Sequence, residues 1–350
     1  MTEIALALET DDLTAEWFSQ VLDRDVTEAV LIESSFGTTG RARVALRGEP
    51  GLPTTVFVKL RPIDEEQRLL VDMTGMGVAE ARFYRDVAAE VAVRVPGVWF
   101  SHTHDDRYVM VLEDLVASGC RFPRPDDPGI VTRAVDIVEQ LAALHAPFWG
   151  SERFEPGGDL DWLGARDMLQ GPVAQMFIQQ AVDALGHEMD TAFHRIAGIF
   201  VSRYDDIGRL WNEGGGTLVH GDTHLGNLFV DVTDDRTGFL DWAVVCRAHG
   251  MRDVAYVLCN SVPQPEREAN ERALVERYCE LLAGAGVDID AAKAWEQYRL
   301  FAVYSWVAAT ATAGMGSKWQ PLDVGLSATR RATAACAHLD SAGLLESLLG

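Results

Sequence analysis

Three oxygen-bearing side chains, at positions 222, 227 and 241, have the types and spacing expected of a phosphoryl-transfer centre. They lie in the segments LVHGDTHLGN (218–227) and FLDW (239–242). In kinases, an aspartate that meets the substrate hydroxyl is followed five positions later by an asparagine that meets a metal, with a histidine two positions before it. His220, Asp222 and Asn227 keep this spacing, so Asp222 is the candidate catalytic residue.

The second metal ligand is expected from a short β-hairpin. Leu228–Val230 and Phe239–Leu240 read as strands, and Asp231–Gly238 has the composition of a turn. Because neighbouring ends of an antiparallel hairpin lie side by side, we expect Asn227 and Asp241 to converge. An amide and a carboxylate oxygen suit Mg²⁺, which takes the rest of its ligands from water and phosphates.

A lysine and a glutamate are the candidate phosphate grip. Only three of the 30 basic residues are lysines, and Lys59 is the only one before position 293. It ends an apolar strand, where kinases hold the phosphates of the nucleotide. Glu80 lies beside the apolar face of the next helix and needs a cation there, so it is the expected partner of Lys59. The alternatives are a surface lysine at a sheet edge and a solvated helix glutamate.

The segment 34–40 (SSFGTTG) is the candidate phosphate loop. It contains neither of the common glycine-rich phosphate motifs. It does lie between two expected strands, and its backbone N–H groups could cradle phosphates. The candidate contacts are Ser35, Gly37, Thr38 and Gly40. As a stand-alone motif, the segment is more typical of an ordinary hairpin turn.

The segment 108–115 (YVMVLEDL) reads as a strand that runs into a linker. Met110, Glu113 and Leu115 are the candidates for contact with an adenine. A plain buried strand is the alternative. Asp253 is expected either to cap the helix that follows it or to brace the catalytic loop.

The elements that position these residues change character along the chain. A helix over 13–22 and strands over 26–32, 41–46 and 54–60 are expected first, followed by a helix over 77–91 and a strand pair over 98–101 and 108–112. Helices over 130–144, 173–197 and 200–211 follow a linker rich in Pro, Gly and Asp. The pattern predicts an α+β protein with a small antiparallel β-rich N-lobe (1–115) that binds nucleotide and a larger, mostly helical C-lobe (116–350) that binds substrate.

The formal net charge of −23 argues against nucleic acid or an anionic membrane surface as a partner. The five cysteines have no zinc-ligand spacing, which is typical of reduced thiols in the cytoplasm. We see no signal peptide and no apolar run long enough to span a membrane. The sequence does not indicate an oligomeric state.

With these motifs, the chain resembles the aminoglycoside phosphotransferase and choline kinase superfamily. The resemblance is carried by HGDTHLGN, FLDW, VFVKL and YVMVLEDL, and EARFY and LHAPFW look most like its ecdysteroid-kinase-like branch. It implies a bilobal, protein-kinase-like fold and transfer of the γ-phosphate of ATP, with Mg²⁺, to a hydroxyl of a small molecule. Asp222 would be the base, Asn227 and Asp241 the metal ligands, and His220 a structural residue.

Two other functions fit parts of the pattern. Asp222 and His224 form a D-x-H of the kind found in metal-dependent phosphoesterases, which need further ligands. A non-catalytic nucleotide-binding protein would keep the same site. The acceptor is open: the aromatic segment 295–306 fits core packing, an apolar ring or a quaternary amine, and Asp159 and Asp161 fit an amino sugar.

Overall fold

The computed structural model describes residues 6–36, 39–164, 171–214, 216–316 and 322–350. The chain divides into two compact units. Unit 1 comprises Met1–Arg121 and Phe229–Val244, and unit 2 comprises Phe122–Leu228 and Val245–Gly350. The sequence-based boundary was 115/116, whereas the units divide after Arg121 and the hairpin segment 229–244 belongs to unit 1.

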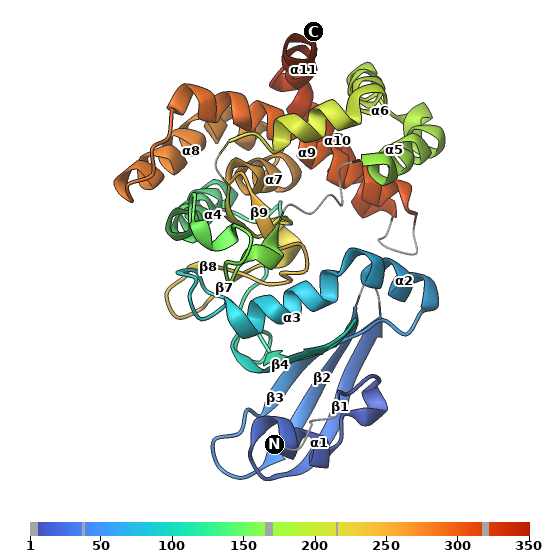
Figure 1. Cartoon of the computed structure of the whole chain (residues 1–350), viewed down its shortest axis with the longest axis vertical. Coiled ribbons are helices and arrows are strands. Elements are labelled where there is room, and N and C mark those ends of the chain that lie inside the picture. The colour runs from blue at the N-terminus through green and yellow to red at the C-terminus, as the bar shows by residue number, and fades with distance from the viewer. Residues whose placement is uncertain (1–5, 37–38, 165–170, 215, 317–321) are drawn as a thin grey trace. The chain divides into compact units, whose positions relative to one another are not determined.

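Unit 1 is built on a five-stranded antiparallel sheet in the order β1-β2-β3-β5-β4 (Figure 1). Its strands are β1 (Val26–Phe36), β2 (Gly40–Gly48), β3 (Thr55–Leu60), β4 (Val98–His104) and β5 (Arg107–Glu113). Its helices are α1 (Ala15–Leu22), α2 (Glu65–Thr74) and α3 (Met76–Asp86), with a 3₁₀ turn at Thr10–Asp12. A second small sheet pairs β7 (Leu228–Val230) with β8 (Thr237–Phe239).

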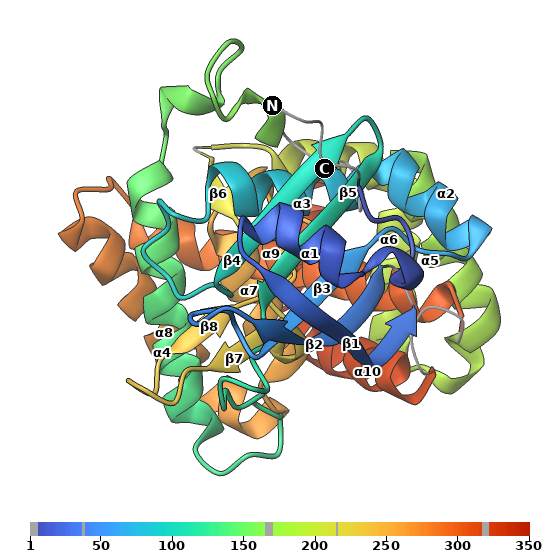
Figure 2. The same cartoon turned by 90° about the horizontal axis from the view of Figure 1, so that it is seen from below.

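One face of the large sheet carries the core of unit 1, and the other carries the candidate site. Successive strand residues point to opposite faces, so Ala42, Val44 and Leu46 of β2 turn inward while residues 41, 43 and 45 turn to the other side. The inward residues pack against Trp17 and Phe18 of α1, which lies across the sheet (Figure 2). Lys59 occupies the opposite face from this core.

Helix α3 is shorter than expected and follows a second helix. The sequence pattern predicted one helix over 77–91, but α3 ends at Asp86 and α2 precedes it. Gly75 separates the two in the left-handed conformation, with φ of 63°. A side chain at Gly77 would collide with the ring of Tyr108, so this glycine lets α3 lie close against β5.

Unit 2 is mostly helical (Figure 1). Its helices are α4 (Ile130–His145), α5 (Gly171–Leu185), α6 (Thr191–Trp211), α7 (Met251–Ser261), α8 (Gln264–Gly284), α9 (Ala291–Gly314), α10 (Leu322–His338) and α11 (Ser341–Leu349). A two-stranded sheet pairs β6 (Thr217–Val219) with β9 (Cys246–Ala248). Short 3₁₀ turns lie at Ala146–Phe148, Glu152–Phe154, Asp161–Leu163, Gly186–Glu188 and Leu225–Asn227.

The predicted helix over 173–197 is interrupted. Helix α5 ends at Leu185, and Asp190 then accepts a hydrogen bond from the N–H of Phe193, which starts α6. Helix α6 continues to Trp211 with a kink at Arg203. Both a glycine at 186 and an N-capping aspartate at 190 are stop and start signals that the periodicity alone did not reveal.

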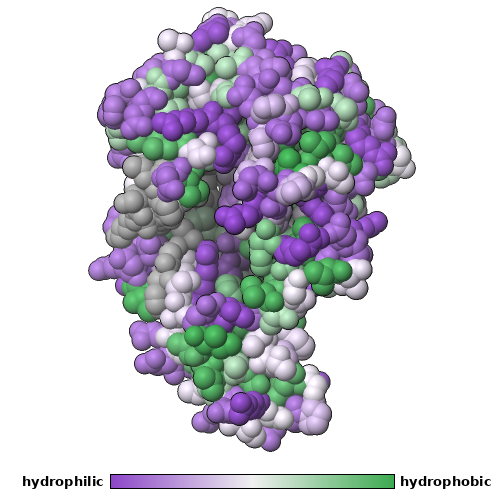
Figure 3. Space-filling model, turned by 180° about the vertical axis from the view of Figure 1, so that it is seen from behind, coloured by the Kyte–Doolittle hydropathy of each residue, from purple (hydrophilic) through white to green (hydrophobic). Residues whose placement is uncertain are grey.

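Figure 3 shows the hydropathy of one face of the molecule. On the face drawn in Figure 3, hydrophilic side chains predominate and hydrophobic ones form scattered patches. None of the helices within the described ranges is both long and apolar enough to cross a membrane. The aromatic side chains Tyr298, Phe301, Tyr304 and Trp306 of α9 are buried, as core packing requires.

Candidate active site

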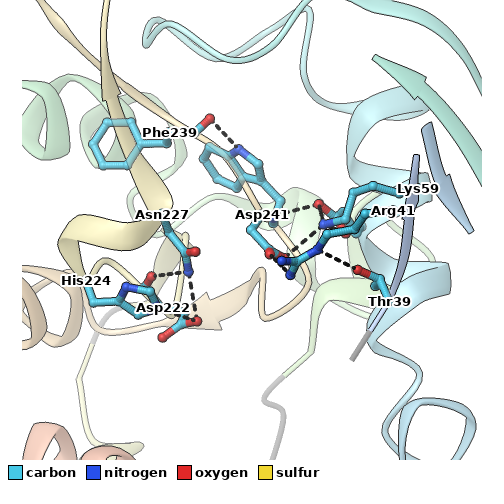
Figure 4. A network of polar contacts seen from close by, with 10 residues as sticks. Thr39, Arg41, Lys59, Asp222, His224, Asn227, Phe239 and Asp241 are labelled. Atoms are coloured by element: carbon cyan, nitrogen blue, oxygen red, sulfur yellow. Dashed lines mark hydrogen bonds and ion pairs between the residues drawn. The ribbon is translucent and has the colours of Figure 1, made fainter. Parts of the chain in front are cut away.

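Lys59, Glu80 and Asp241 meet on the site face of unit 1 (Figure 4). The Lys59 Nζ lies 2.7 and 2.6 Å from the two carboxylate oxygens of Glu80 and 3.1 Å from Oδ1 of Asp241. Burial alone would lower the pKa of Lys59, but the charges of Asp241 and Glu80 raise it overall. The ammonium therefore stays charged, and the structure contains the predicted Lys59–Glu80 ion pair.

Asp241 is held by its backbone as well as by its partners. It adopts the left-handed conformation, with φ of 63°, which is uncommon for a residue other than glycine. The next N–H, from Trp242, donates to Oε1 of Glu80 over 3.2 Å. The Trp242 ring stacks on Phe83 of α3 at a centroid distance of 3.9 Å. These contacts tie the segment after β8 to helix α3.

Five further residues of unit 1 are candidates for contact with the nucleotide. Gly37 and Thr38 lie outside the described residues. Ser35 is exposed at the end of β1 and Gly40 begins β2, so both flank that segment. Met110 is fully buried opposite Lys59 in the β3–β5 register.

Glu113 and Leu115 already make bonds within unit 1. The Glu113 carboxylate is paired with Arg94 at 2.7 Å, and its N–H donates to the Gly97 carbonyl. Burial would raise the pKa of Glu113, but hydrogen bonds from Gly97 and Arg94 lower it overall. The Leu115 carbonyl accepts from Cys120. A contact of either residue with an adenine stays a prediction.

Three polar side chains surround Asp222 in unit 2, and two of them, Asn227 and His224, are drawn with it in Figure 4. The Asn227 amide donates to the Asp222 carbonyl and to its Oδ2, each over 2.9 Å. His224 Nε2 lies 3.6 Å from Oδ2. His224 Nδ1 accepts from the Gly226 N–H, which places the ring proton on Nε2, toward the carboxylate. The third is Tyr256 of α7, whose hydroxyl donates to Asp222.

The electrostatics keep Asp222 ionised. Burial would raise its pKa, but the charge and hydrogen bond of His224 and the hydrogen bond from Tyr256 hold that pKa well below its usual range. Gly221 just before it has φ of 87°, a conformation that favours glycine and sets the turn of the loop. Asp222 is therefore a poised acceptor for hydrogen bonds from a hydroxyl group.

Asp253 braces this loop from beneath. Its fully buried carboxylate accepts from the N–H groups of His220, at 2.7 Å, and Gly221, at 2.9 Å. The His145 ring bridges Asp253, at 3.3 Å, and the Tyr278 hydroxyl, at 2.7 Å. Burial would raise the pKa of Asp253, but the His145 hydrogen bond and nearby positive charge lower it overall. The bracing role, one of two expected from the sequence, is the one observed.

The two predicted metal ligands, Asn227 of unit 2 and Asp241 of unit 1, each carry an oxygen of the kind that hard divalent cations prefer. The Asn227 nitrogen is engaged by Asp222, so the amide oxygen points the other way and can serve as a ligand. The Asp241 carboxylate has a side-chain exposure of 22% and can be approached. No group of three or more His, Cys, Asp or Glu side chains that could hold a metal occurs among the described residues.

Sequence reasoning missed three residues of the site. Arg41 of β2 approaches Asp241 to 3.5 Å, but one arginine among many carried no signal. Tyr256 lies three positions after Asp253, on the same side of α7, and this helical spacing could have pointed to it. His145 approaches from a helix more than a hundred residues away, and only the tertiary fold reveals it.

Solved structures of kinases share this fold. Choline kinase LicA from Streptococcus pneumoniae has a TM-score of 0.50 at 13% identity, covering 92% of this chain and 96% of that one. Choline kinase from Cryptosporidium parvum Iowa II has a TM-score of 0.53 at 10% identity, covering 92% and 90%. The GDP complex of aminoglycoside 2'-phosphotransferase-IIIa has a TM-score of 0.50 at 12% identity, covering 91% and 96%.

These likenesses confirm the predicted α+β, protein-kinase-like fold class. No curated protein sequence matches the chain. The profile of the family described as "Phosphotransferase enzyme family" matches residues 40–301, a range that includes Lys59, Glu80, Asp222, Asn227 and Asp241. The match extends over well more than half of the chain. The chain therefore belongs to the phosphotransferase enzyme family, within the superfamily that its motifs resemble.

Proposed function

We propose that this phosphotransferase moves the γ-phosphate of ATP onto a hydroxyl group of a small molecule. The observation that carries the proposal is the buried Lys59–Glu80 pair in contact with Asp241. A lysine fixed by a helix glutamate, beside a carboxylate that can bind a metal, is the arrangement with which kinases hold the phosphates of a nucleotide. A cytoplasmic location, where ATP is available, is part of this proposal.

Each half of the site has its own task. Lys59 would contact the phosphates, with its orientation fixed by Glu80. Asp222 would accept a hydrogen bond from the acceptor hydroxyl, orient it and take its proton. Asn227 and Asp241 would hold Mg²⁺, which neutralises charge on the phosphates when it is bound. Most of the catalysis would come from positioning and charge, because the transition state of phosphoryl transfer is loose.

A small molecule is the preferred acceptor class. Two of the similar structures are choline kinases and one is an aminoglycoside phosphotransferase. Asp241 is followed by Trp242-Ala243, and only 11 residues separate Asp241 from Asp253, which is too short for an ordinary activation segment of a protein kinase. The contact residues for nucleotide and acceptor, and the ecdysteroid-kinase-like branch, stay predictions.

The acceptor candidates can be narrowed slightly. Asp159, a candidate partner of an amino sugar, already forms a hydrogen-bonded pair with Arg153. Asp161 accepts from the N–H of Gly157 and remains exposed. Four of the five aromatic side chains of α9 are buried and Trp295 is half-buried, so a quaternary amine or steroid held by this helix stays a prediction. Neither a phosphoesterase nor a nucleotide-binding protein without activity gains support from the described residues.

The test is phosphoryl transfer from ATP with Mg²⁺ to a panel of alcohols, sterols, amino sugars and choline. Mass spectrometry detects the phosphorylated product. The Asp222→Asn variant should lower kcat by ~10²–10⁴-fold and leave nucleotide affinity nearly unchanged. Asp288→Asn, at an exposed position of the same unit, is the matched control. Full turnover by Asp222→Asn, or phosphate release from simple esters without nucleotide, would overturn the proposal.

A further inference from the structure

The charged group around Lys59 contains too few cations to bind the phosphates of a nucleotide. In unit 1, one ammonium faces two carboxylates, from Glu80 and Asp241. This group carries a net negative charge and would repel a triphosphate before any metal binds. Arg41 restores neutrality, because its guanidinium lies 3.5 Å from Oδ2 of Asp241 while Lys59 holds Oδ1 (Figure 4).

The strand register explains why Arg41 reaches this point. Arg41 of β2 lies opposite Lys59 of β3 on one side and opposite Ser35 of β1 on the other. Directly opposed residues of neighbouring antiparallel strands share a face of the sheet. Ser35, Arg41 and Lys59 therefore form one row across three strands. The row crosses the sheet next to the candidate phosphate loop.

The two cations of this row are held very differently. Lys59 is 4% exposed and is fixed by a hydrogen bond to each oxygen of Glu80. Arg41 is 41% exposed and its ion pair with Asp241 is longer; within the described part of the chain, its other hydrogen bond runs from Nε to the Thr39 hydroxyl over 3.2 Å. A half-exposed ion pair contributes little and is exchanged at low cost.

Arg43, two positions further along β2, is held firmly by carboxylates. Arg43 donates two hydrogen bonds to the buried carboxylate of Asp114, at 3.0 and 2.9 Å, and pairs with Glu33 at 3.2 Å. Arg41 and Arg43 both line a hollow of about 200 Å³ on this face. The rest of its wall comes from Glu33, Ser34, Ser35, Ala42 and Phe57. Of the two guanidinium groups that line this hollow, only that of Arg41 is weakly held.

We propose that Arg41 is a second phosphate-binding cation, which moves from Asp241 to the terminal phosphates of the nucleotide when the nucleotide binds. This rests on the proposed function. A guanidinium binds phosphate oxygens through two parallel hydrogen bonds, which a longer ion pair to one carboxylate oxygen cannot match. The exchange also releases Asp241 to serve a metal ion, so nucleotide and metal assist one another's binding.

The experiment measures binding by calorimetry on the full chain, with a non-hydrolysable ATP analogue, ADP and adenosine. Arg41→Gln should weaken binding of the analogue by roughly 10- to 100-fold, that of ADP by less, and that of adenosine not at all. Arg41→Lys should recover part of the loss, because it keeps the charge without the fork. Arg47→Gln is the control, since Arg47 lies on the same strand, is 81% exposed and pairs only at the surface with Glu28.

A second arm separates direct contact from an effect relayed by Asp241. In EDTA, Arg41→Gln is compared in the wild-type and Asp241→Asn backgrounds. A direct phosphate contact predicts a similar loss in both, whereas disappearance of the loss with Asp241→Asn would overturn the proposal. Equal binding of the analogue by wild type and Arg41→Gln would also overturn it. If wild type binds no nucleotide at all, the proposed function fails, and this inference fails with it.

Discussion

The Lys59 Nζ lies 2.6 Å from Oε2 of Glu80, and the two side chains are only 4% and 0% exposed. A buried pair of this kind costs much more to break from one side than to remove entirely. Lys59→Met leaves the Glu80 carboxylate without its cation, so the free energy of unfolding should fall by about 3–5 kcal/mol. Urea unfolding of the single variants and of Lys59→Met/Glu80→Gln forms a double-mutant cycle.

The cycle has a clear expected outcome. The double variant should regain at least half of the stability lost by Lys59→Met, while phosphoryl transfer stays low in every variant without Lys59. Strictly additive losses would show that the pair makes no energetic contribution of its own.

Replacement of Asp253 should lower stability and turnover far more than replacement of Tyr278, which lies at the outer end of the same hydrogen-bond network. Asp253→Asn places an amide opposite the N–H groups of His220 and Gly221, so a loss of about 2–4 kcal/mol and a large fall in kcat are expected. Tyr278→Phe removes only the hydroxyl that meets His145 and should cost about 1 kcal/mol. Thermal unfolding and turnover measure both, and equal effects of the two changes would contradict the bracing role.

Tyr256 should set the acid side of the activity profile. Its hydroxyl is one of the groups that hold the pKa of Asp222 well below the usual range, so wild-type activity should not decline from protonation of Asp222 above about pH 4. Tyr256→Phe removes a hydrogen bond to the charged form, which raises that pKa and moves the acid limb of kcat/KM to higher pH. An unchanged limb with a lower plateau would indicate a packing role only.

Removal of the Asn227 amide should first raise the Mg²⁺ concentration that activity requires. Asn227→Ala deletes both the proposed ligand oxygen and the bond that orients Asp222. We expect the Mg²⁺ concentration at half-maximal activity to rise by roughly 10-fold or more, with kcat partly recovered at high Mg²⁺. Asn270→Ala, on the distant helix α8, is the control. An unaltered Mg²⁺ requirement would remove Asn227 from the metal site.

His249 should make the protein sensitive to mild acid. Burial, with a smaller contribution from His145, lowers the pKa of His249 to about 4. The unfolded chain binds this proton near pH 6.5, so the free energy of unfolding should decline as pH falls from about 6.5 to 4, by roughly 1–3 kcal/mol. His249→Asn should flatten the slope in urea titrations, whereas His187→Asn, at an exposed position, should leave it unchanged.

The sequence supported those parts of the site that are local. Asp222 and Asn227 lie on one short loop, so their spacing implied the hydrogen bond between them. Lys59 was identifiable because lysine is rare in this chain, and Glu80 because a carboxylate on an apolar helix face needs a cation.

What the sequence could not reveal depends on contacts between distant segments. The Asp253–His145–Tyr278 network joins three helices, and no local pattern announces it. Arg41 could be linked to the site only through the strand register, which sets it beside Lys59. The break between α5 and α6 was missed because apolar periodicity continues across it, although Gly186 and Asp190 mark it.

The stacking of Trp242 on Phe83 has a consequence for synthesis of the protein. Unit 1 is assembled from two stretches separated by more than a hundred residues, and the later stretch supplies this ring and the N–H that meets Glu80. Nascent chains emerge N-terminus first. Until residues 229–244 have been synthesised, Phe83 therefore lacks the ring that stacks on it, and Glu80 has Lys59 but not the N–H of Trp242.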